Sequence, residues 1–220
     1  MTPSLIMPLV RKDWYLHRGT LKVVLAAGLL SLALQLGGGV LAIFGLTSTV
    51  ACTIIFGVVL CQSTVSERLK HHEPFVMSLP VTPLELAAAK VLANLSMFLM
   101  VWLLLMAGLF VLFTVRALPG FIPPATVAAF ALVVGFLAML CVSTVVRSEK
   151  AWVVTMMATN FAYGAVWLVL ASMPGVKEQA FGPVAVWDPH LIWLLGGELF
   201  LAIIVLAFGA YAQSRRTSFL

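Results

Sequence analysis

Charged residues are scarce in this sequence. Asp, Glu, Lys and Arg together make up 10% of the 220 residues, whereas hydrophobic residues make up 62%. An ordinary soluble domain contains about 25% charged residues, so this chain has too little polar surface for a water-soluble fold. The scarcity of charge predicts an integral membrane protein.

Cysteine is also rare, with three residues in the whole chain. Cys52, Cys61 and Cys141 all lie in apolar stretches, where both a disulfide partner and an oxidant are hard to reach. This excludes a disulfide framework, and we expect the three thiols to act as small apolar side chains.

Motifs for metal and phosphate binding are missing as well. His71 and His72 are adjacent, and adjacent residues diverge by about 100° on a helix, unlike the i, i+4 pair of a zinc protease. His17 lies on the same side of the predicted membrane and His190 on the other. We expect no metal site, with the histidines solvated near the headgroups. The sequence has no G-x-x-x-x-G-K-[ST] phosphate loop, so any ATP hydrolysis must occur on another chain.

Long apolar runs are what the sequence has in abundance. A helix needs roughly 18 to 20 apolar residues to cross the hydrocarbon, and six runs reach about that length. They are Leu21–Phe44, Leu46–Val65, Val91–Val115, Ala125–Val146, Ala151–Met173 and Leu191–Ala212. Their continuous apolarity excludes a β-barrel, whose strands alternate in polarity. The predicted fold is all-α and polytopic, and residues 1–220 form one transmembrane domain because no internal repeat or boundary divides them.

The basic residues predict the orientation of the six spans. With both termini on one side, eleven of the 13 Lys and Arg residues lie there, and Arg116 and Lys177 lie opposite. The eleven are Arg11, Lys12, Arg18, Lys22, Arg68, Lys70, Lys90, Arg147, Lys150, Arg215 and Arg216. Cytoplasmic loops carry the excess of Lys and Arg, so both termini should be cytoplasmic. The net charge of +5 then indicates contact with anionic lipid rather than with nucleic acid.

Short connections join several of these spans. Gly37-Gly38-Gly39 or the residues just after it form a tight external turn, which makes the first two helices antiparallel neighbours. The last external segment, Pro174 to His190, carries Phe181 and Trp187. Aromatic residues of this kind suit the interface, so the segment could hold a short helix on or within the outer leaflet.

The segment before the first span has two interpretations. As a helix, Pro8–Gly19 brings Val10 and Trp14 onto one side, which Asp13 and His17 flank. It forms either an interfacial helix anchored by Trp14 and Tyr15 or a basic flank that fixes topology.

Ser66–Lys90 is the extended polar stretch in the first half of the chain. Thr82-Pro83-Leu84-Glu85 predicts a helix start, because Thr can cap, Pro suits the first turn and Glu can reach back to the cap. Pro74 and Pro80 bound the apolar segment between them, Phe75 to Leu79. Such a segment either rests on lipid or docks into a groove of another protein.

This stretch resembles a loop of type-2 ABC exporter permeases. The residues that carry the resemblance are Glu67, then Ser78-Leu79-Pro80-Val81-Thr82, then Glu85 and Lys90 before a span. Leu9-Val-Arg-Lys-Asp-Trp14 also resembles the elbow helix of that family. Six spans, cytoplasmic termini and a short chain match its half-transporter form. The resemblance implies a prokaryotic inner-membrane subunit that forms a homodimer or pseudo-dimer. It also implies a separate ABC ATPase, which binds the ATP and Mg²⁺.

The resemblance also implies which residues couple the two subunits. A short coupling helix between spans two and three would enter the ATPase groove, with Phe75, Val76 and Met77 as buried anchors. Glu67, Arg68, Lys70 and Glu73 would set the register at its rim, and Leu79 would close the segment.

Three polar residues within the spans could line a substrate path. Polar groups are expensive in hydrocarbon and usually face the protein interior, so Gln35, Asn160 and Glu198 are the candidates. Gly196 and Gly197 beside Glu198 permit close backbone approach. Alternatively, Glu198 is interfacial or a neutral acid, and Gln35 and Asn160 hydrogen-bond between helices.

Two other functions fit six spans. The substrate-capturing subunit of an energy-coupling importer would contain a ligand pocket in the monomer and no conspicuous coupling loop. A polytopic enzyme acting on lipid would need a cluster of carboxylates, a His pair or a Ser/His combination on one face, and the sequence gathers none. The sequence leaves the transported substrate open.

Overall fold

The fold consists of long helices running side by side. The computed structural model describes residues 3–69, 83–146 and 148–215. In that part of the chain, six helices are long and apolar enough to cross a membrane. They are α1 (Pro3–Gln35), α2 (Gly39–Leu69), α4 (Pro83–Val115), α5 (Ile122–Val145), α6 (Glu149–Ser172) and α8 (Pro189–Ser214). The predicted all-α fold with six spans is confirmed.

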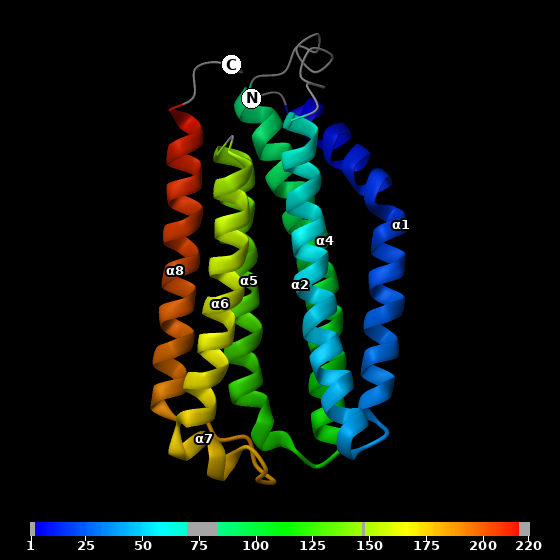
Figure 1. The fold of residues 1–220 in the computed structure, drawn as a ribbon, viewed down its shortest axis with the longest axis vertical. Helices are drawn as coiled ribbons and strands as arrows, with labels where there is room; N and C mark the ends of the chain where they lie inside the picture. The colour runs from blue at the N-terminus through cyan, green and yellow to red at the C-terminus, as the bar shows by residue number, and fades with distance from the viewer. Residues whose placement is uncertain (1–2, 70–82, 147, 216–220) are drawn as a thin grey trace.

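The helices form two groups that meet along α5. Helices α1, α2 and α4 pack against one another, and α6 and α8 each pack on α5. Helix α5 also contacts α2 and α4, so it joins the groups, and α1 and α8 lie at opposite edges of the bundle (Figure 1). We call the end where α1 begins, α2 ends and α4 begins the basic end, after Arg11, Lys12, Arg18 and Lys90.

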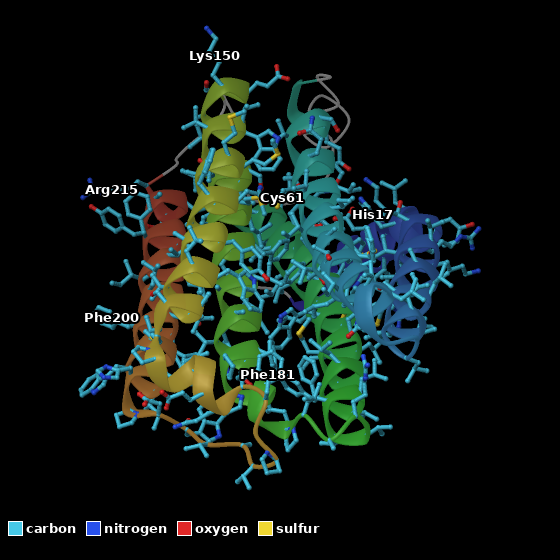
Figure 2. The ribbon with its side chains drawn as sticks, turned by 60° about the horizontal axis from the view of Figure 1, so that its bottom comes forward. His17, Cys61, Lys150, Phe181, Phe200 and Arg215 are labelled. Atoms are coloured by element: carbon cyan, nitrogen blue, oxygen red, sulfur yellow. The ribbon has the colours of Figure 1, made fainter. Side chains whose placement is uncertain are left out.

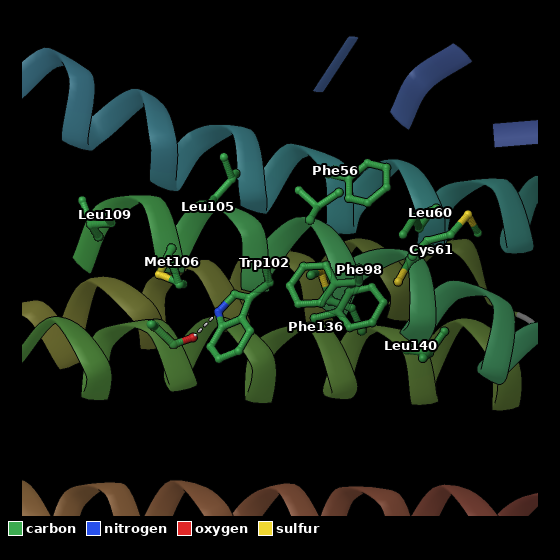
Figure 3. Close-up of a cluster of buried hydrophobic side chains, with 14 of the residues drawn as sticks. Phe56, Leu60, Cys61, Phe98, Trp102, Leu105, Met106, Leu109, Phe136 and Leu140 are labelled. Atoms are coloured by element: carbon green, nitrogen blue, oxygen red, sulfur yellow. Dashed lines mark hydrogen bonds between the residues drawn. The ribbon is translucent and has the colours of Figure 1, made fainter. Parts of the chain in front are cut away.

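The core lies between α2, α4 and α5. Phe98 of α4 and Phe136 of α5 stack face to face with ring centroids 3.9 Å apart. Figure 3 shows this pair beside Trp102, whose indole nitrogen donates a hydrogen bond to the carbonyl oxygen of Ala129 at 2.9 Å. Leu60 of α2 is completely buried in the same cluster. The three helices therefore form the tightly packed part of the molecule.

The first turn of the chain corrects one predicted boundary. The predicted span Leu21–Phe44 is too long, because α1 ends at Gln35 and α2 already begins at Gly39. Gly38 and Gly39 have φ values of +73° and +49°, which residues with a Cβ rarely adopt. The glycines therefore reverse the chain where the sequence predicted a tight turn, and residues after Gly39 belong to the second helix.

The elbow segment is helical but is not a separate helix. Residues Pro8–Gly19 belong to α1, and Figure 1 shows the first part of α1 running obliquely to the rest. No proline follows Pro8 in this helix, so nothing in the sequence breaks its backbone hydrogen bonds. The predicted helix over the elbow is therefore present as the first part of α1, and it continues into the first span without a break.

Two other predicted helix starts agree with the structure. Helix α4 begins at Pro83, within the predicted Thr82-Pro83-Leu84-Glu85 start. The predicted external segment, Pro174 to His190, contains the short helix α7 (Pro174–Gln179), and a 3-10 helix, Pro119–Phe121, lies between α4 and α5 in the chain. The amide of Gly120 donates to the carbonyl oxygen of Gly182 at 3.2 Å, which ties together the two connections at the end opposite the basic end. The entry of this segment into the outer leaflet stays a prediction.

Helices α6 and α8 present wide apolar surfaces to the outside. Phe161 of α6 is 79% exposed and Trp193 of α8 is 80% exposed. Phe200 lies on the outer side of α8 (Figure 2). Side chains of this kind suit lipid or a second protein subunit.

Candidate functional site

The predicted coupling loop lies between two well-placed helices. Helix α2 ends at Leu69 and α4 begins at Pro83. The predicted coupling residues Lys70, Glu73, Phe75, Val76, Met77 and Leu79 lie outside the described residues, as do His71 and His72. Arg68 lies in the last turn of α2. The site is therefore built from the two helix ends that hold this loop and from the elbow beside them.

Lys90 joins those three elements. Its ammonium nitrogen lies 2.6 Å from Oε2 of Glu67 and 3.0 Å from Oδ2 of Asp13. The Asp13 side chain is 5% exposed, that of Lys90 is 16% exposed and that of Glu67 is 32% exposed. Partly buried ion pairs with this geometry are screened less than surface pairs. A single ammonium group thus fastens the ends of α2 and α4 to each other and to the elbow.

The elbow makes two further polar contacts with these helices. The indole nitrogen of Trp14 donates to Oγ of Ser96 in α4 at 3.0 Å. His17 lies one turn later, and its Nε2 is 3.1 Å from Oγ of Ser63 in α2. Its Nδ1 lies 3.0 Å from the carbonyl oxygen of Asp13, which can only accept, so Nδ1 carries the hydrogen.

His17 corrects the expectation that the histidines are solvated. It is 6% exposed, and Asp13 on the same side of the helix is 3% exposed. Both residues lie where the elbow packs against α2 and α4. There His17 contacts Ser63 of α2, and Asp13 accepts a hydrogen bond from Lys90 of α4. Tyr15 instead is 66% exposed, and the Arg18 guanidinium lies 4.0 Å from its ring centroid. The elbow therefore has a polar inner face and an outer face with an aromatic anchor.

Helices α2 and α4 share another buried hydrogen bond just inside the ion pairs. Nδ2 of Asn94 donates to Oγ1 of Thr64 at 2.9 Å. Asn94 is 1% exposed and Thr64 is 4% exposed. Asn94 follows Lys90 by one turn on the same face of α4. Polar contacts therefore continue from the base of the loop into the bundle.

Gln35, the first predicted path residue, is buried between α1 and α2. Its Nε2 donates to Oγ1 of Thr49 at 3.2 Å, and Ser31 lies 2.9 Å from the same hydroxyl. The backbone carbonyl oxygen of Gln35 accepts a hydrogen bond from Nη1 of Arg116 at 2.6 Å. These bonds hold α1, α2 and α4 together at the end opposite the basic end. A role for Gln35 in the path stays a prediction.

Asn160 of α6 is exposed and lines a cleft. Its Nδ2 donates to the carbonyl oxygen of Met156 at 2.7 Å. The cleft is formed by α2, α4, α5 and α6, with Thr53, Phe98, Gly135 and Tyr163 among its lining residues. Its enclosed volume is about 20 Å³, which accommodates on the order of one water molecule.

Glu198 lies on the side of α8 that packs against α5. Leu191, two turns earlier on the same face, packs with Val127 and Ala128 of α5. Further along this face, a Cβ at Gly209 would lie 2.6 Å from Sγ of Cys141. Oε2 of Glu198 is buried and has no hydrogen-bond partner among the residues that the structure describes. An unpaired carboxyl oxygen in this position is costly, and a role for Glu198 in the path stays a prediction.

The described residues contain no group of three His, Cys, Asp or Glu side chains close enough to hold a metal ion. Cys52, Cys61 and Cys141 are all free, and Cys61 is completely buried. The thiols thus contribute packing. The polar cluster at the basic end provides ion pairs and hydrogen bonds that hold α1, α2 and α4 together.

Comparison with known proteins identifies the family. The sequence matches the family of ABC-2 family transporter proteins over residues 8–218. The chain belongs to the ABC-2 transporter family. No match was found among curated proteins or solved structures. The resemblance of the Ser66–Lys90 stretch to ABC permeases is therefore confirmed by nearly the whole chain, and the family supports a membrane component of a transporter rather than an enzyme.

The site in this ABC-2 chain also contains residues outside the Ser66–Lys90 stretch or not quoted in its motif. Asp13, His17, Ser63 and Asn94 form contacts at the base of the loop. Asp13 and His17 are spaced by one helical turn, as are Lys90 and Asn94. Pairs of polar residues at this spacing next to apolar residues are a sequence signal for a polar contact between helices. That signal could have identified Asp13, His17 and Asn94 from the sequence.

Proposed function

We infer that this chain is the permease subunit of an ATP-driven exporter and docks a separate ABC ATPase through the Ser66–Lys90 stretch. The observation that carries this function is the contact of Lys90 with both Glu67 and Asp13. It supports the function because the helix ends on both sides of the loop are held together and to the elbow. A partner that moves the loop would therefore move three helices.

The loop itself has the composition of a docking segment. Phe75, Val76 and Met77 would fill a groove on the ATPase, and Arg68, Lys70 and Glu73 would pair with charges at its rim. Glu67 would take part in both the rim and the ion pair with Lys90. Leu79 would close the apolar segment before Pro80.

ATP and Mg²⁺ belong to the partner in this proposal. The chain lacks a G-x-x-x-x-G-K-[ST] loop, which cradles the phosphates in such ATPases. The permease needs no cofactor of its own. Closure of two ATPase subunits around ATP would drive the loops of two permeases.

A second copy of the chain would complete the substrate path. Helices α6 and α8 expose apolar surface, and Asn160 and Glu198 lie on these two helices. We propose that substrate crosses between two copies and meets Asn160, which is exposed on α6. Glu198 faces α5 and Gln35 is buried between α1 and α2, so both would enter the path only if these helices move apart during transport. Lipid would cover the remaining apolar surface.

The basic residues support an orientation with both termini in the cytoplasm, and the prokaryotic cell is proposed from the family resemblance alone. The described part of the basic end contains Arg11, Lys12, Arg18 and Lys90, whereas Arg116 lies at the opposite end. Positive residues favour the cytoplasmic side of the inner membrane. The ATPase and its ATP would then meet the loop in the cytoplasm.

An importer subunit that captures a vitamin fits the described residues less well. Such a protein needs a monomer pocket of roughly 300 Å³ or more. The cleft beside Asn160 has an enclosed volume of about 20 Å³, on the order of one water molecule. A lipid-modifying enzyme is disfavoured by the family. The structure does bring Ser63 and His17 together, which corrects the expectation that no Ser/His combination forms, but these two side chains link α1 to α2 within the bundle.

Co-purification tests the proposed function. The chain is coexpressed with a candidate ABC ATPase and isolated through a tag on the permease in mild detergent. We expect the ATPase to co-purify with the wild type and to be lost from a folded Phe75→Asp, Met77→Asp double variant. A Phe161→Asp variant, changed on the exposed face of α6, serves as the control for added charge. A wild type without ATPase, or a double variant that retains it fully, would overturn the proposal.

A further inference from the structure

Three consecutive residues near the end of α2 reach three different helices. Oε1 of Gln62 accepts a hydrogen bond from the indole nitrogen of Trp152 in α6. Oγ of Ser63 contacts His17 in α1, and Oγ1 of Thr64 accepts from Asn94 in α4. Successive residues of a helix point about 100° apart, which is why one turn can address three neighbours. Helix α2 is therefore a hub one to two turns before the predicted coupling loop.

The contact with α6 differs from the other two. Helices α1 and α4 already pack extensively against α2, whereas α6 packs mainly on α5. The Gln62–Trp152 hydrogen bond therefore gives α6 a direct link to the helix that leads into the loop.

Helix α6 is anchored near its two ends. Of its residues, all of which the structure describes, Trp152 and Leu170 are buried, at 2% and 1% exposed. Trp152 inserts into the core cluster that contains Leu60 and Cys61 of α2. Leu170 packs with Leu191 and α5 at the opposite end. Between these two positions no side chain of α6 is buried, and Phe161 in the middle is 79% exposed.

The cleft lies between these two anchors. Thr159, Asn160 and Tyr163 form its α6 wall, and Thr53 and Gly57 form its α2 wall. A displacement of Trp152 relative to Leu170 would tilt the α6 wall against the α2 wall. The contact at the basic end can thus change the shape of a surface in the middle of the bundle.

We propose that Gln62 and Trp152 transmit movement of the coupling loop to α6, and so act as positioning residues for transport. The inference rests on the proposed function, because the loop must be driven by an ATPase. Neither residue touches the ATPase or the substrate. Their hydrogen bond makes α6 follow the end of α2, whereas α1 and α4 follow it through packing and ion pairs.

Distance measurements between spin labels test this role without knowledge of the substrate. Nitroxides are attached at Leu30→Cys and Phe161→Cys after Cys52, Cys61 and Cys141 are replaced by Ala. Leu30 on α1 and Phe161 on α6 are 64% and 79% exposed, so the labels need no rearrangement of the core. Labelled permease is diluted with unlabelled permease, and pulsed electron resonance compares the nucleotide-free complex with the complex trapped by ATP and vanadate.

We expect the distance in the otherwise unchanged protein to shift on trapping. The shift should be lost in Gln62→Leu and Trp152→Phe, although both variants still co-purify with the ATPase and hydrolyse ATP. Gln62→Glu keeps an oxygen acceptor and should retain the shift. Trp102→Phe is the matched control, because it removes an indole hydrogen bond to Ala129 between α4 and α5 and leaves α6 untouched.

The results separate the inference from the proposed function. A full shift in Gln62→Leu, no shift in the parent complex, or loss of the shift in Trp102→Phe would overturn the role of Gln62 and Trp152 while the ATPase still binds. Absence of the ATPase from the parent preparation would overturn the proposed function, and the inference with it.

Discussion

Lys90 and Glu67 form an ion pair 2.6 Å long across the base of the predicted coupling loop. One residue lies in the last turn of α2 and the other in the third turn of α4. The pair therefore closes the loop at its root. Asp13, at 3.0 Å from the same ammonium nitrogen, extends this closure to the elbow.

Removal of the Lys90 charge should destabilise the protein. Lys90→Met leaves two partly buried carboxylates without their cation, and breaking a buried pair costs about 3–5 kcal/mol. Because the Glu67 side chain is 32% exposed, we expect a smaller loss, about 2 kcal/mol. Thermal unfolding in detergent should show a decrease in Tm of about 4–8 °C. Lys150→Met, at an exposed position in the first turn of α6, is the control, and an equal effect there would contradict the assignment.

Gly45 should not tolerate a side chain. A Cβ at this position would lie 2.6 Å from the carbonyl oxygen of Ser31 and 2.5 Å from Cγ of Gln35. Gly45→Ala should force α1 and α2 apart, and overpacking of this kind costs about 1–3 kcal/mol. Gly164→Ala in α6 meets no atom within 4 Å and should leave the thermal stability unchanged or raise it. Equal unfolding temperatures for both variants would show that the close approach of α1 and α2 is wrong.

The Glu198 carboxyl group should lower the free energy of unfolding of the protein. Its Oε2 is buried without a hydrogen-bond partner among the described residues, and an unsatisfied group of this kind costs about 1–3 kcal/mol. Glu198→Leu should therefore raise Tm, by about 2–4 °C for each kcal/mol recovered. Leu195→Ile on the inner side of α8 is the comparison, for which we expect no gain. If Glu198→Leu lowers Tm instead, the carboxyl group contributes to packing and loses its place in the proposed path.

The predicted orientation can be tested by labelling of single cysteines in intact cells. In a background without Cys52, Cys61 and Cys141, a membrane-impermeant maleimide should label Phe181→Cys from outside. It should label Ser148→Cys only after the membrane is opened. Phe181 is 74% exposed at the external end, and Ser148 is exposed between α5 and α6. The reverse pattern would place the loop between α2 and α4 on the wrong side for a cytoplasmic ATPase.

The helices themselves could be predicted because apolar length is a local property of the sequence. Pro83 gave the start of α4, and Gly37–Gly39 gave the first turn. The predicted end of the first span was wrong because Val40–Phe44, which follows the turn, is as apolar as the helix before it. Hydropathy alone therefore cannot assign these residues to the second helix. The elbow was predicted as a helix or a basic flank, and its polar residues did not show that the helix continues unbroken into the first span.

The candidate site was only partly predictable. Glu67 and Lys90 were included in the family motif, but their pairing depends on how α2 and α4 pack. Asp13 and His17 read as solvated polar residues until their partners on α2 and α4 are known. The contact of Gln62 with Trp152 joins residues far apart in the sequence, and no local periodicity reports it. Contacts between helices depend on tertiary packing, and local patterns in one sequence do not identify which residues meet.

Photocrosslinking from the loop tests the central claim most directly. A photoreactive phenylalanine analogue is introduced at Phe75 in the permease coexpressed with its ATPase, and Phe181 at the opposite end serves as the control position. We predict a crosslink between position 75 and the ATPase, identified by mass spectrometry of the joined peptides, and none from position 181. A complex in which position 75 crosslinks only to lipid or to a second permease would contradict the account.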